Sequence, residues 1–561
     1  MAWRGQVFSR SNYVKLLRLQ NLTGRCGVTC RTLSTNSFNQ HKNENGENSH
    51  EAKIRSSTSL IAAAGVLSFG LAWNFLHNRT ECKEDLSGFG KRVDNLPNYK
   101  RSDVAEHTTP EKRIWVTFRH GVYDITDFVI GHPGGNKILL ASGKGLEAFY
   151  ATYAVHYKKE VLEYLEELRI GNVHPDDMKV TAAVKDANDP FANDPARHPA
   201  LRVNSEKPFN AEPPPELLPD SFNTPNDLFF VRNHLPVPKI DEKKFRLEVS
   251  GQGMRRPVSF SVADLKKTFH VHKIGAAVQC AGNRRSNMAE FKKVRGLNWG
   301  TAAISNAEWT GVKLVDVLTY AGVKEEEIGH VIFQGLDKDA IEGNHYEASI
   351  PAASAMDPRK DVMIVFEMNG KPLPLDHGFP LRIIAPGIAG ARQVKWVHKI
   401  IVSKNESDSH WQKSDYKSFN PSIDWDTIDY EKAVAIQEYP IQSAICEPTE
   451  GTVIEDDEVT IKGYAWSGGG RGIIRVEVSA DGGKTWTDAP LQNASQPLHR
   501  QWAWTLFEVT VPIPKDHKGE VELICKAIDS SHNQQPERAE GIWNVRGLIH
   551  NAWHRIKVKV A

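Results

Sequence analysis

The chain of 561 residues has few cysteines and almost no net charge. Its six cysteines lie far apart, which excludes both a zinc-ribbon spacing and the dense disulfide framework of a small secreted domain. Lysine and arginine total 70 against 69 aspartate and glutamate, so no global field favours nucleic acid or an anionic membrane. Any anion site must therefore be a local cluster of arginines, and redox chemistry would require a cofactor.

Acidic residues are missing from residues 1–43, although this stretch carries seven lysines and arginines. Such a composition is typical of a mitochondrial transit peptide. The uncharged residues 56–78 follow, close to the ~20 apolar residues that span a bilayer. We expect residues 1–79 to be a transit peptide and a hydrophobic sorting segment, cleaved to release the mature protein into the mitochondrial intermembrane space. A retained membrane anchor is the alternative.

The chain also lacks internal repeats and long low-complexity tracts, so its domains have to be found from changes of pattern. Residues 176–218 are rich in Pro, Asp, Asn and Ala and lack apolar periodicity, which predicts a flexible linker. In residues 219–433 strands alternate with short helices and Gly/Pro turns, as in a mixed α+β domain. The length of 561 residues predicts about three or four domains in all.

Residues 434–561 change to an all-β pattern. Ile474, Val476 and Val478 alternate with polar residues, and residues 481–483 (Asp-Gly-Gly) supply a hairpin turn. Several such strands predict an immunoglobulin-like β-sandwich. The glycine-rich residues 468–472 lack the Gly-Lys-Ser/Thr ending of a phosphate loop, so we expect a turn between strands.

Two histidines suggest a metal site in residues 98–175. Residues 114–118 and 122–125 predict two strands joined by a turn, with Thr126 as a helix cap. His132 then precedes Pro-Gly-Gly, and His156 follows after a stretch that can form helices on either side of a flat ligand. Two facing imidazoles would fill both axial positions of a haem iron, which could then pass electrons but not readily bind oxygen.

This stretch resembles cytochrome b5 in its two strands, its His-Pro-Gly-Gly motif and the distance to the second histidine. The resemblance implies that His132 and His156 ligate a b-type haem. Either histidine alone would be an ordinary surface or core residue, so the prediction rests on the pair.

A second cluster begins at Cys280, which stands beside Arg284 and Arg285 after a short apolar run. A thiolate can bind a soft transition metal while arginines hold an oxyanion next to it. A lone cysteine in this setting is more often a small buried hydrophobe. Residues 226–234, 375–382 and 392–396 change that reading, because they add aromatic, histidine and cationic side chains that suit a phosphorylated organic cofactor.

From the haem region to the C-terminus these segments resemble the sulfite oxidase family. The resemblance implies that Cys280 ligates the molybdenum of a molybdenum-molybdopterin cofactor. It assigns to the pterin Phe229, Phe230, Val231, Arg232, Asn233, Asp337, His377, Arg382, Gln393, Val394 and Lys395, and to the substrate pocket Arg232, Arg285, Trp299, Tyr416 and Arg546. Gln393 departs from the Arg-His-Val-Lys stretch expected there, which puts one pterin contact in doubt.

The family resemblance further implies oxidation of sulfite to sulfate, single-electron transfers through the haem to cytochrome c, and a homodimer formed by the C-terminal domain. Two alternatives stay open at this point. One is a molybdenum nitrate reductase, disfavoured because the haem region precedes the molybdenum region and no flavin or nicotinamide domain follows. The other is a cytochrome b5-type electron carrier with an inactive binding module, disfavoured by Cys280 together with Arg232 and Arg285.

Overall fold

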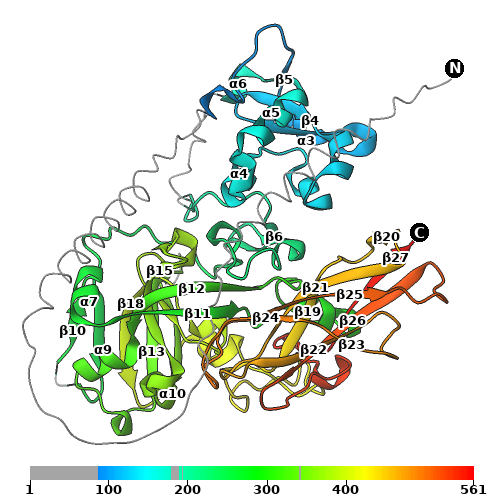
Figure 1. Cartoon of the computed structure of the whole chain (residues 1–561). Helices are drawn as coiled ribbons and strands as arrows, with labels where there is room; N and C mark the ends of the chain where they lie inside the picture. Colours follow the sequence, from blue (N-terminus) through cyan, green and yellow to red (C-terminus); the bar gives the residue numbers. More distant parts are fainter. Residues whose placement is uncertain (1–85, 179–188, 193, 255, 340–342) are drawn as a thin grey trace, which may run out of the picture. The chain divides into compact units, whose positions relative to one another are not determined.

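The computed structural model describes residues 86–178, 189–192, 194–254, 256–339 and 343–561 (Figure 1). The expected transit peptide and sorting segment, residues 1–79, lie outside these ranges. Within them, no helix has both the length and the apolar character needed to cross a membrane. Three regions of secondary structure follow one another along the described chain.

The first region consists of one five-stranded sheet and several short helices, and it contains His132 and His156. The sheet order is β1-β5-β4-β3-β2, and the elements are β1 (Asn98–Tyr99), α3 (Arg101–Glu106), β2 (Thr108–Thr109), β3 (Arg113–Phe118), β4 (Gly121–Asp124), α4 (Glu147–Thr152), α5 (Lys159–Glu167), β5 (Arg169–Val173) and α6 (Pro175–Met178). The two strands predicted before His132 are thus confirmed as β3 and β4. Thr126 was wrongly predicted as a cap. It is the first residue of a 3-10 turn capped by Ile125, because its hydroxyl donates to Asp124 and accepts from the Ile114 N–H.

Two five-stranded sheets form the central region. Their orders are β10-β9-β18-β13-β14 and β11-β12-β15-β16, with β17 paired to β15. The strands are β9 (Leu247–Gly251), β10 (Val258–Phe260), β11 (Val271–Gln279), β12 (Ile304–Lys313), β13 (His330–Lys338), β14 (His345–Pro351), β15 (Met363–Met368), β16 (Lys371–Pro372), β17 (Arg382–Ile384) and β18 (Val397–Ser403), and the helices are α7 (Val262–Thr268), α8 (Arg285–Phe291), α9 (Leu314–Tyr320) and α10 (Ala352–Met356).

One apolar core joins these two sheets. Leu247 and Val331 from the first sheet and Ile364 from the second are fully buried in it. Each such side chain contributes about 1.5–3 kcal/mol of hydrophobic stabilisation. The two sheets that carry the candidate site are therefore held together by a packed core.

The predicted linker contains ordered structure in its second half. β6 (Arg202–Ser205) and β7 (Asn210–Glu212) pair with each other, and β7 pairs with β8 (Val231–Arg232) in a three-stranded sheet. Asn210 and Glu212 are buried, because their polar side chains bind backbone groups of the central region. The polar residues of this stretch are therefore buried hydrogen-bonding residues. The prediction of a flexible linker, which was based on polar composition, does not hold for residues 202–212.

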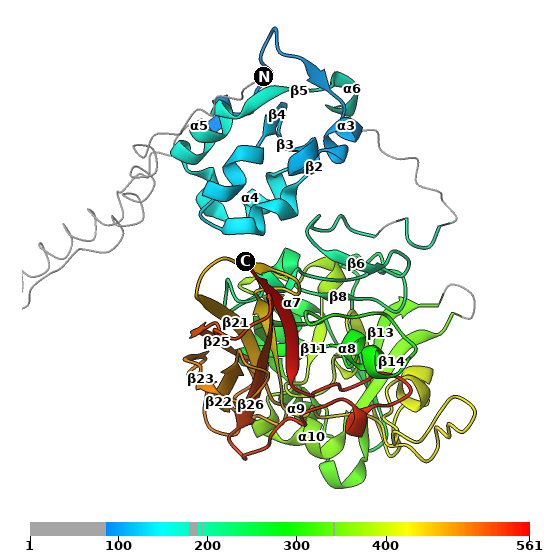
Figure 2. The same ribbon diagram turned by 90° about the vertical axis from the view of Figure 1, so that its right-hand side faces the viewer.

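The last region is a pair of sheets with orders β19-β21-β25-β24 and β20-β27-β26-β22-β23 (Figure 2). Its strands are β19 (Gln442–Glu447), β20 (Val453–Ile454), β21 (Glu458–Trp466), β22 (Ile473–Ser479), β23 (Thr487–Asp488), β24 (Leu491–Asn493), β25 (Thr505–Pro512), β26 (Glu520–Asp529) and β27 (His554–Val560). Both sheets contribute to one core, which gives the predicted β-sandwich.

The predicted alternation of β22 is wrong at its first residue. A register shift between Ile473 and Arg475 turns Ile474 outward, where it is 50% exposed, and buries Ile473 instead. Val476 and Val478 are buried as predicted. Residues 468–472 connect β21 to β22, as expected for a turn.

Candidate functional site

His132 and His156 face each other in the first region. Their rings are nearly parallel, at 3° with centroids 6.1 Å apart. This separation leaves space for a metal ion bound to one nitrogen of each ring at about 2 Å. Burial lowers the pKa of both histidines, which favours the neutral imidazole that a metal requires. The geometry therefore fits a haem iron with both axial positions filled.

Strand β11 places Cys280 at the second site. Because side chains alternate across a strand, Ala276 and Val278 point to the same face as Cys280, the residue that follows the strand. All three belong to one buried cluster with Phe230. The Gly282 N–H donates a hydrogen bond to the Cys280 sulfur at 3.4 Å. The sulfur is thus buried yet open to the neighbouring cavity.

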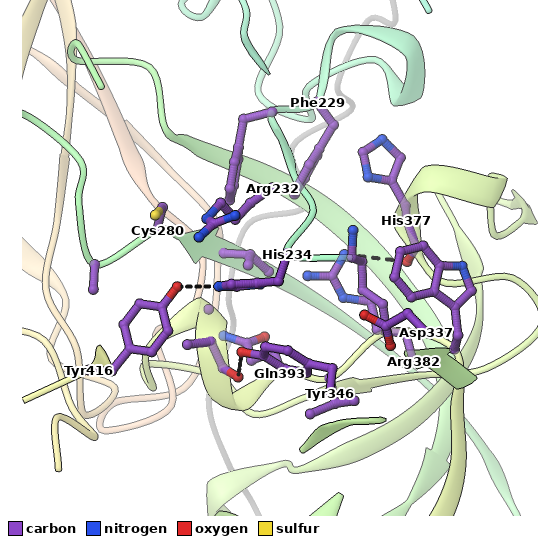
Figure 3. A pocket seen from close by; sticks show the side chains of 18 residues that line it. Phe229, Arg232, His234, Cys280, Asp337, Tyr346, His377, Arg382, Gln393 and Tyr416 are labelled. Carbon is purple, nitrogen blue, oxygen red and sulfur yellow. Dashed lines mark hydrogen bonds between the residues drawn. The ribbon is translucent and has the colours of Figure 1, made fainter. Parts of the chain in front are cut away.

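A narrow cavity of about 50 Å³ lies beside Cys280 (Figure 3). It collects residues from the aromatic segment before β8, the end of β11, and the loops around β13, β17 and β18. Its lining consists of Phe229, Phe230, Arg232, His234, Val278, Cys280, Ala281, Asp337, Tyr346, His377, Arg382, Gly390, Ala391, Gln393, Val394, Lys395, Trp396 and Tyr416.

The cavity carries more positive than negative charge. Arg232, Arg382 and Lys395 line it, against the single carboxylate of Asp337. Burial lowers the pKa of Arg382 to about 9, and it lowers that of Lys395 to about 7 against the opposing charges of Asp376 and Asp337. Arg382 Nε and Asp337 Oδ1 are also without hydrogen-bond partners among the described residues. An anionic ligand with hydrogen-bonding groups, such as a phosphorylated pterin, would satisfy both deficits.

Two polar side chains position the Cys280 end of the cavity. Asn210 of β7 accepts a hydrogen bond from Arg232 Nη1 at 3.0 Å and so fixes the guanidinium. His234 Nε2 lies 2.6 Å from the Tyr416 hydroxyl. Burial raises the pKa of Tyr416, against the opposing charge of Arg232, so the hydroxyl keeps its proton. Figure 3 shows Cys280, Arg232 and Tyr416 at one end of the cavity, and Asp337 and Arg382 at the other.

Arg285, at the start of α8, is held by backbone oxygens. Its Nε donates to the carbonyls of Arg546 and Gly547, both at 3.2 Å, and its Nη1 donates to Leu297 at 2.8 Å. A side chain at Gly282 would come within 2.8 Å of this guanidinium, so the chain needs glycine there. Burial lowers the pKa of Arg285, and the Cys280 sulfur opposes that shift. Arg285 is therefore fixed close to the sulfur.

Several predicted site residues lie beside the cavity rather than on its wall. Arg546 binds Asp415 at 2.6 Å, next to Tyr416. Trp299 is buried in the same apolar cluster as Cys280. Val231, Asn233 and Arg285 are likewise absent from the lining. Gln393 does line it, but its amide is used internally, with Nε2 donating to the Ile388 carbonyl at 2.8 Å.

Sequence reasoning missed His234, Tyr346 and Trp396 as lining residues. His234 ends the aromatic segment 226–234, and this position in the sequence marks it as a candidate site residue. Tyr346 donates to the Ala391 carbonyl at 2.8 Å from strand β14. Nothing in the sequence around Tyr346 marks it as a site residue, because its role depends on the pairing of β14 with β13.

Comparison with known proteins gives three family matches along the chain. Residues 100–174 match the cytochrome b5-like heme/steroid binding domain, 234–411 the oxidoreductase molybdopterin binding domain, and 433–561 the Mo-co oxidoreductase dimerisation domain. Sulfite oxidase of Gallus gallus is 53% identical over 82% of this chain and 100% of its own length. The chain belongs to the sulfite oxidase family. The fold class and the two kinds of cofactor-binding region expected from the sequence are thereby confirmed.

Other members of the sulfite oxidase family are similarly close. The mitochondrial sulfite oxidase of Homo sapiens is 52% identical over 82% of this chain and 84% of its own length. Among solved structures, the sulfane dehydrogenase SoxCD of Paracoccus pantotrophus aligns with a TM-score of 0.51 at 28% identity, over 63% of this chain and 87% of that one.

Proposed function

We propose that this member of the sulfite oxidase family oxidises sulfite to sulfate at a molybdenum-molybdopterin centre ligated by Cys280. The observation that carries the proposal is the convergence of the Cys280 sulfur, the Arg232 guanidinium and the Tyr416 hydroxyl at one end of a cationic cavity. Neither alternative drawn from the sequence is favoured. A nitrate reductase of Hordeum vulgare is also similar to this chain, but at 38% identity and over only 45% of its own length.

The chain's residues divide the work between substrate and cofactor. Arg232 and Arg285 hold the sulfite oxyanion through charge-assisted hydrogen bonds, and Arg546 and Trp299 support the pocket from beside its wall. The Tyr416 hydroxyl, bound to His234, donates a hydrogen bond to the substrate oxygen without adding a full charge. Asp337, His377, Arg382 and Lys395 hold the pterin and its phosphate. When bound, the molybdenum supplies the two-electron redox change and the oxygen atom that sulfite gains.

His132 and His156 hold a b-type haem that receives the electrons one at a time. A haem held by both His132 and His156 would supply electron transfer to an outside acceptor in place of oxygen binding. We propose cytochrome c as that acceptor. A flexible stretch within residues 176–218 lets the haem region approach the molybdenum region and leave it again.

The mature protein acts as a homodimer in the mitochondrial intermembrane space. The match of residues 433–561 to a dimerisation family supports self-association through the C-terminal β-sandwich. The acid-free residues 1–43 and the apolar stretch after them support mitochondrial import followed by cleavage. Light scattering on the purified protein tests the dimer, and N-terminal sequencing of mitochondrial material tests the cleavage.

Elemental analysis and product assays test the activity. The proposal expects molybdenum, pterin and haem in each chain, sulfate formed from sulfite, and cytochrome c reduced in step. Protein that reduces nitrate with a reduced dye but leaves sulfite unchanged would instead favour the nitrate reductase reading.

A further inference from the structure

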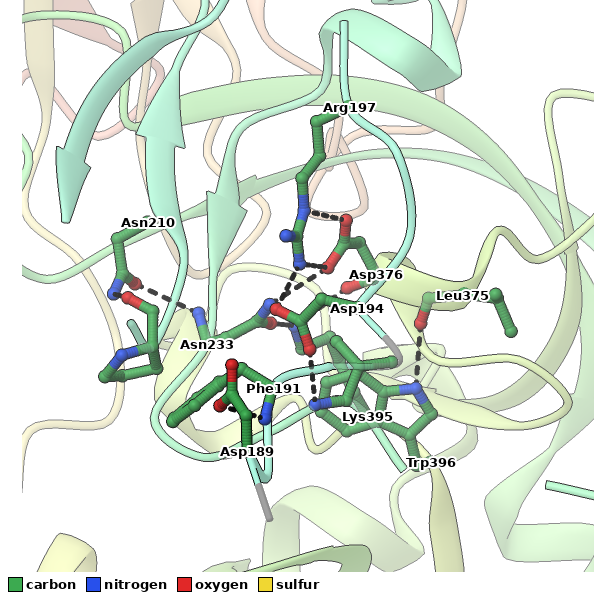
Figure 4. Close-up of polar contacts among 12 residues, drawn as sticks. Asp189, Phe191, Asp194, Arg197, Asn210, Asn233, Leu375, Asp376, Lys395 and Trp396 are labelled. Carbon is green, nitrogen blue, oxygen red and sulfur yellow. Dashed lines mark hydrogen bonds and ion pairs between the residues drawn. The ribbon is translucent and has the colours of Figure 1, made fainter. Parts of the chain in front are cut away.

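Arg197 lies in the predicted linker yet forms a buried ion pair with the central region (Figure 4). Its Nε contacts Asp376 Oδ2 at 2.9 Å and its Nη2 contacts Asp376 Oδ1 at 3.0 Å, a two-pronged arrangement. Nη2 also contacts Asp194 at 2.8 Å, and the guanidinium stacks on Phe209 at 4.0 Å. The side chains of Arg197 and Asp376 are only 14% and 8% exposed, so solvent screens this pair weakly.

Asp376 connects Arg197 to the wall of the cavity. Its Oδ1 accepts a hydrogen bond from Asn233 Nδ2 at 2.9 Å, and its backbone oxygen accepts one from Lys395 Nζ at 2.8 Å. Lys395 Nζ donates in addition to Asn233 Oδ1. Asn233, Asp376 and Lys395 thus form a closed ring in which each residue binds the other two. Lys395 and the neighbour of Asp376, His377, line the cavity.

The charges explain why this ring depends on Arg197. Burial by itself would raise the pKa of Asp376, but the hydrogen bonds from Arg197 and the charge of Lys395 bring it below its ordinary value. Without Arg197, a buried carboxylate would rely on Lys395 for its compensation. Lys395 would then be drawn toward Asp376 and away from an anion in the cavity.

We propose that Arg197 is a positioning residue of the cofactor site: by neutralising Asp376 it leaves the charge and the third N–H of Lys395 Nζ to hold the phosphate of the pterin cofactor. The segment that follows the haem region thereby controls how firmly the cofactor is retained. This inference rests on the proposed function, since it takes the ligand of the cavity to be a phosphorylated pterin.

The test is the rate at which pterin is lost from purified full-length protein. Arg197→Met keeps most of the side-chain stem but removes the charge, and we expect pterin to dissociate at least tenfold faster than from the wild type. Released and retained pterin are measured by fluorescence after oxidation and normalised to haem absorbance. Arg202→Met is the matched control, because Arg202 lies in the same segment but pairs with Glu216 at 50% exposure. Its pterin loss should equal that of the wild type.

Two further variants separate positioning from general damage. Arg197→Lys restores a charge without the planar fork, so pterin loss should be intermediate. Arg197→Met combined with Asp376→Asn removes the unpaired carboxylate and keeps an acceptor for Asn233, so retention should recover at least in part. Molecules that still carry pterin should have an unchanged KM for sulfite, because Arg197 does not reach the Cys280 end. If Arg197→Met fails to fold, the rates of pterin loss from Arg197→Lys and from the double variant test the inference instead.

The inference is overturned if Arg197→Met or, failing that variant, Arg197→Lys loses pterin no faster than Arg202→Met. Failure of the proposed function looks different, because the wild-type protein would then contain no pterin at all. The role of Arg197 would also be overturned if Arg202→Met lost pterin as fast as Arg197→Met, since the effect would then belong to the segment as a whole.

Discussion

The Nε2 atom of His234 lies 2.6 Å from the hydroxyl of Tyr416, although the two residues are 182 positions apart in the chain. Burial, reinforced by the charges of Arg232 and Lys395, lowers the pKa of His234 well below its usual value, so this imidazole is neutral. A neutral imidazole can fix the direction of the tyrosine hydroxyl without competing with the substrate for positive charge.

Replacing His234 should therefore slow catalysis, because the Tyr416 hydroxyl would lose the partner that fixes its direction. We expect His234→Phe to lower kcat/KM for sulfite about tenfold, equivalent to ~1.4 kcal/mol, because one buried hydrogen bond is lost. His234→Gln, which can still bind the hydroxyl, should retain most of the activity. Steady-state kinetics on protein normalised to molybdenum measures both. The exposed His270, changed to Phe, is the control, and an unaltered His234→Phe enzyme would refute the role.

Arg285 should govern the binding of sulfite more than its turnover. Arg285→Lys keeps a charge but cannot donate at once to three backbone oxygens and to the substrate, so KM should rise by about 10- to 100-fold, as expected for ~1.5–3 kcal/mol. Initial rates over a wide sulfite range give KM and kcat separately. Arg295→Lys, nearby but exposed, should match the wild type. A normal KM in Arg285→Lys would remove Arg285 from the substrate pocket.

The stability of the C-terminal region should fall as the pH drops below about 6.5. Burial, reinforced by the charge of Arg284, lowers the pKa of His554 well below its usual value, and its Nδ1 accepts a hydrogen bond from the Ile445 N–H. Below about pH 6.5 the unfolded chain therefore binds more protons at His554 than the folded chain does. The free energy of unfolding falls by about 1.4 kcal/mol for each pH unit through this one group.

His554→Gln tests this pH dependence. Denaturant unfolding at pH 7.5 and pH 5.5 should give a smaller loss of stability for His554→Gln than for the wild type, by roughly 1 kcal/mol. Because His550 has a similarly lowered pKa, part of the dependence should persist. An identical pH response in both proteins would mean that His554 does not titrate as described.

Deleting residues 179–188 should slow electron transfer inside the protein. We expect sulfite-driven haem reduction to fall about tenfold or more, since a shorter tether restricts the approach of the haem region. The KM for sulfite, measured with an artificial acceptor that bypasses the haem, should stay unchanged. A Gly/Ser segment of the same length is the control. Undiminished haem reduction in the deletion would reject the tether.

Local patterns predicted those features that depend on neighbouring residues. The strands β3 and β4, the β-sandwich and the motif around His132 could be identified because each is encoded within a short stretch. Cys280 stood out because a soft sulfur followed by two arginines is chemically unusual. The family resemblance then added Asp337 and Arg382, which no local pattern would have joined to Cys280.

Long-range pairing accounts for what the sequence did not reveal. Arg197 and Asp376 are 179 positions apart, and composition alone suggested that Arg197 lies in a solvated linker. Asn210 likewise became a partner of Arg232 only through the pairing of β7 with β8. Ile474 was misassigned because a single register shift in β22 reverses which side chains point inward.

Anaerobic mixing of the fully loaded protein with sulfite tests the central claim most directly. The haem spectrum should change from ferric to ferrous within the dead time or the first turnovers, in wild-type protein but not in Cys280→Ser protein that carries the same amount of haem. Ferric haem that persists in molybdenum-loaded wild-type protein after sulfite is added would contradict the claim that electrons pass from sulfite, at a Cys280-ligated centre, to the iron between His132 and His156.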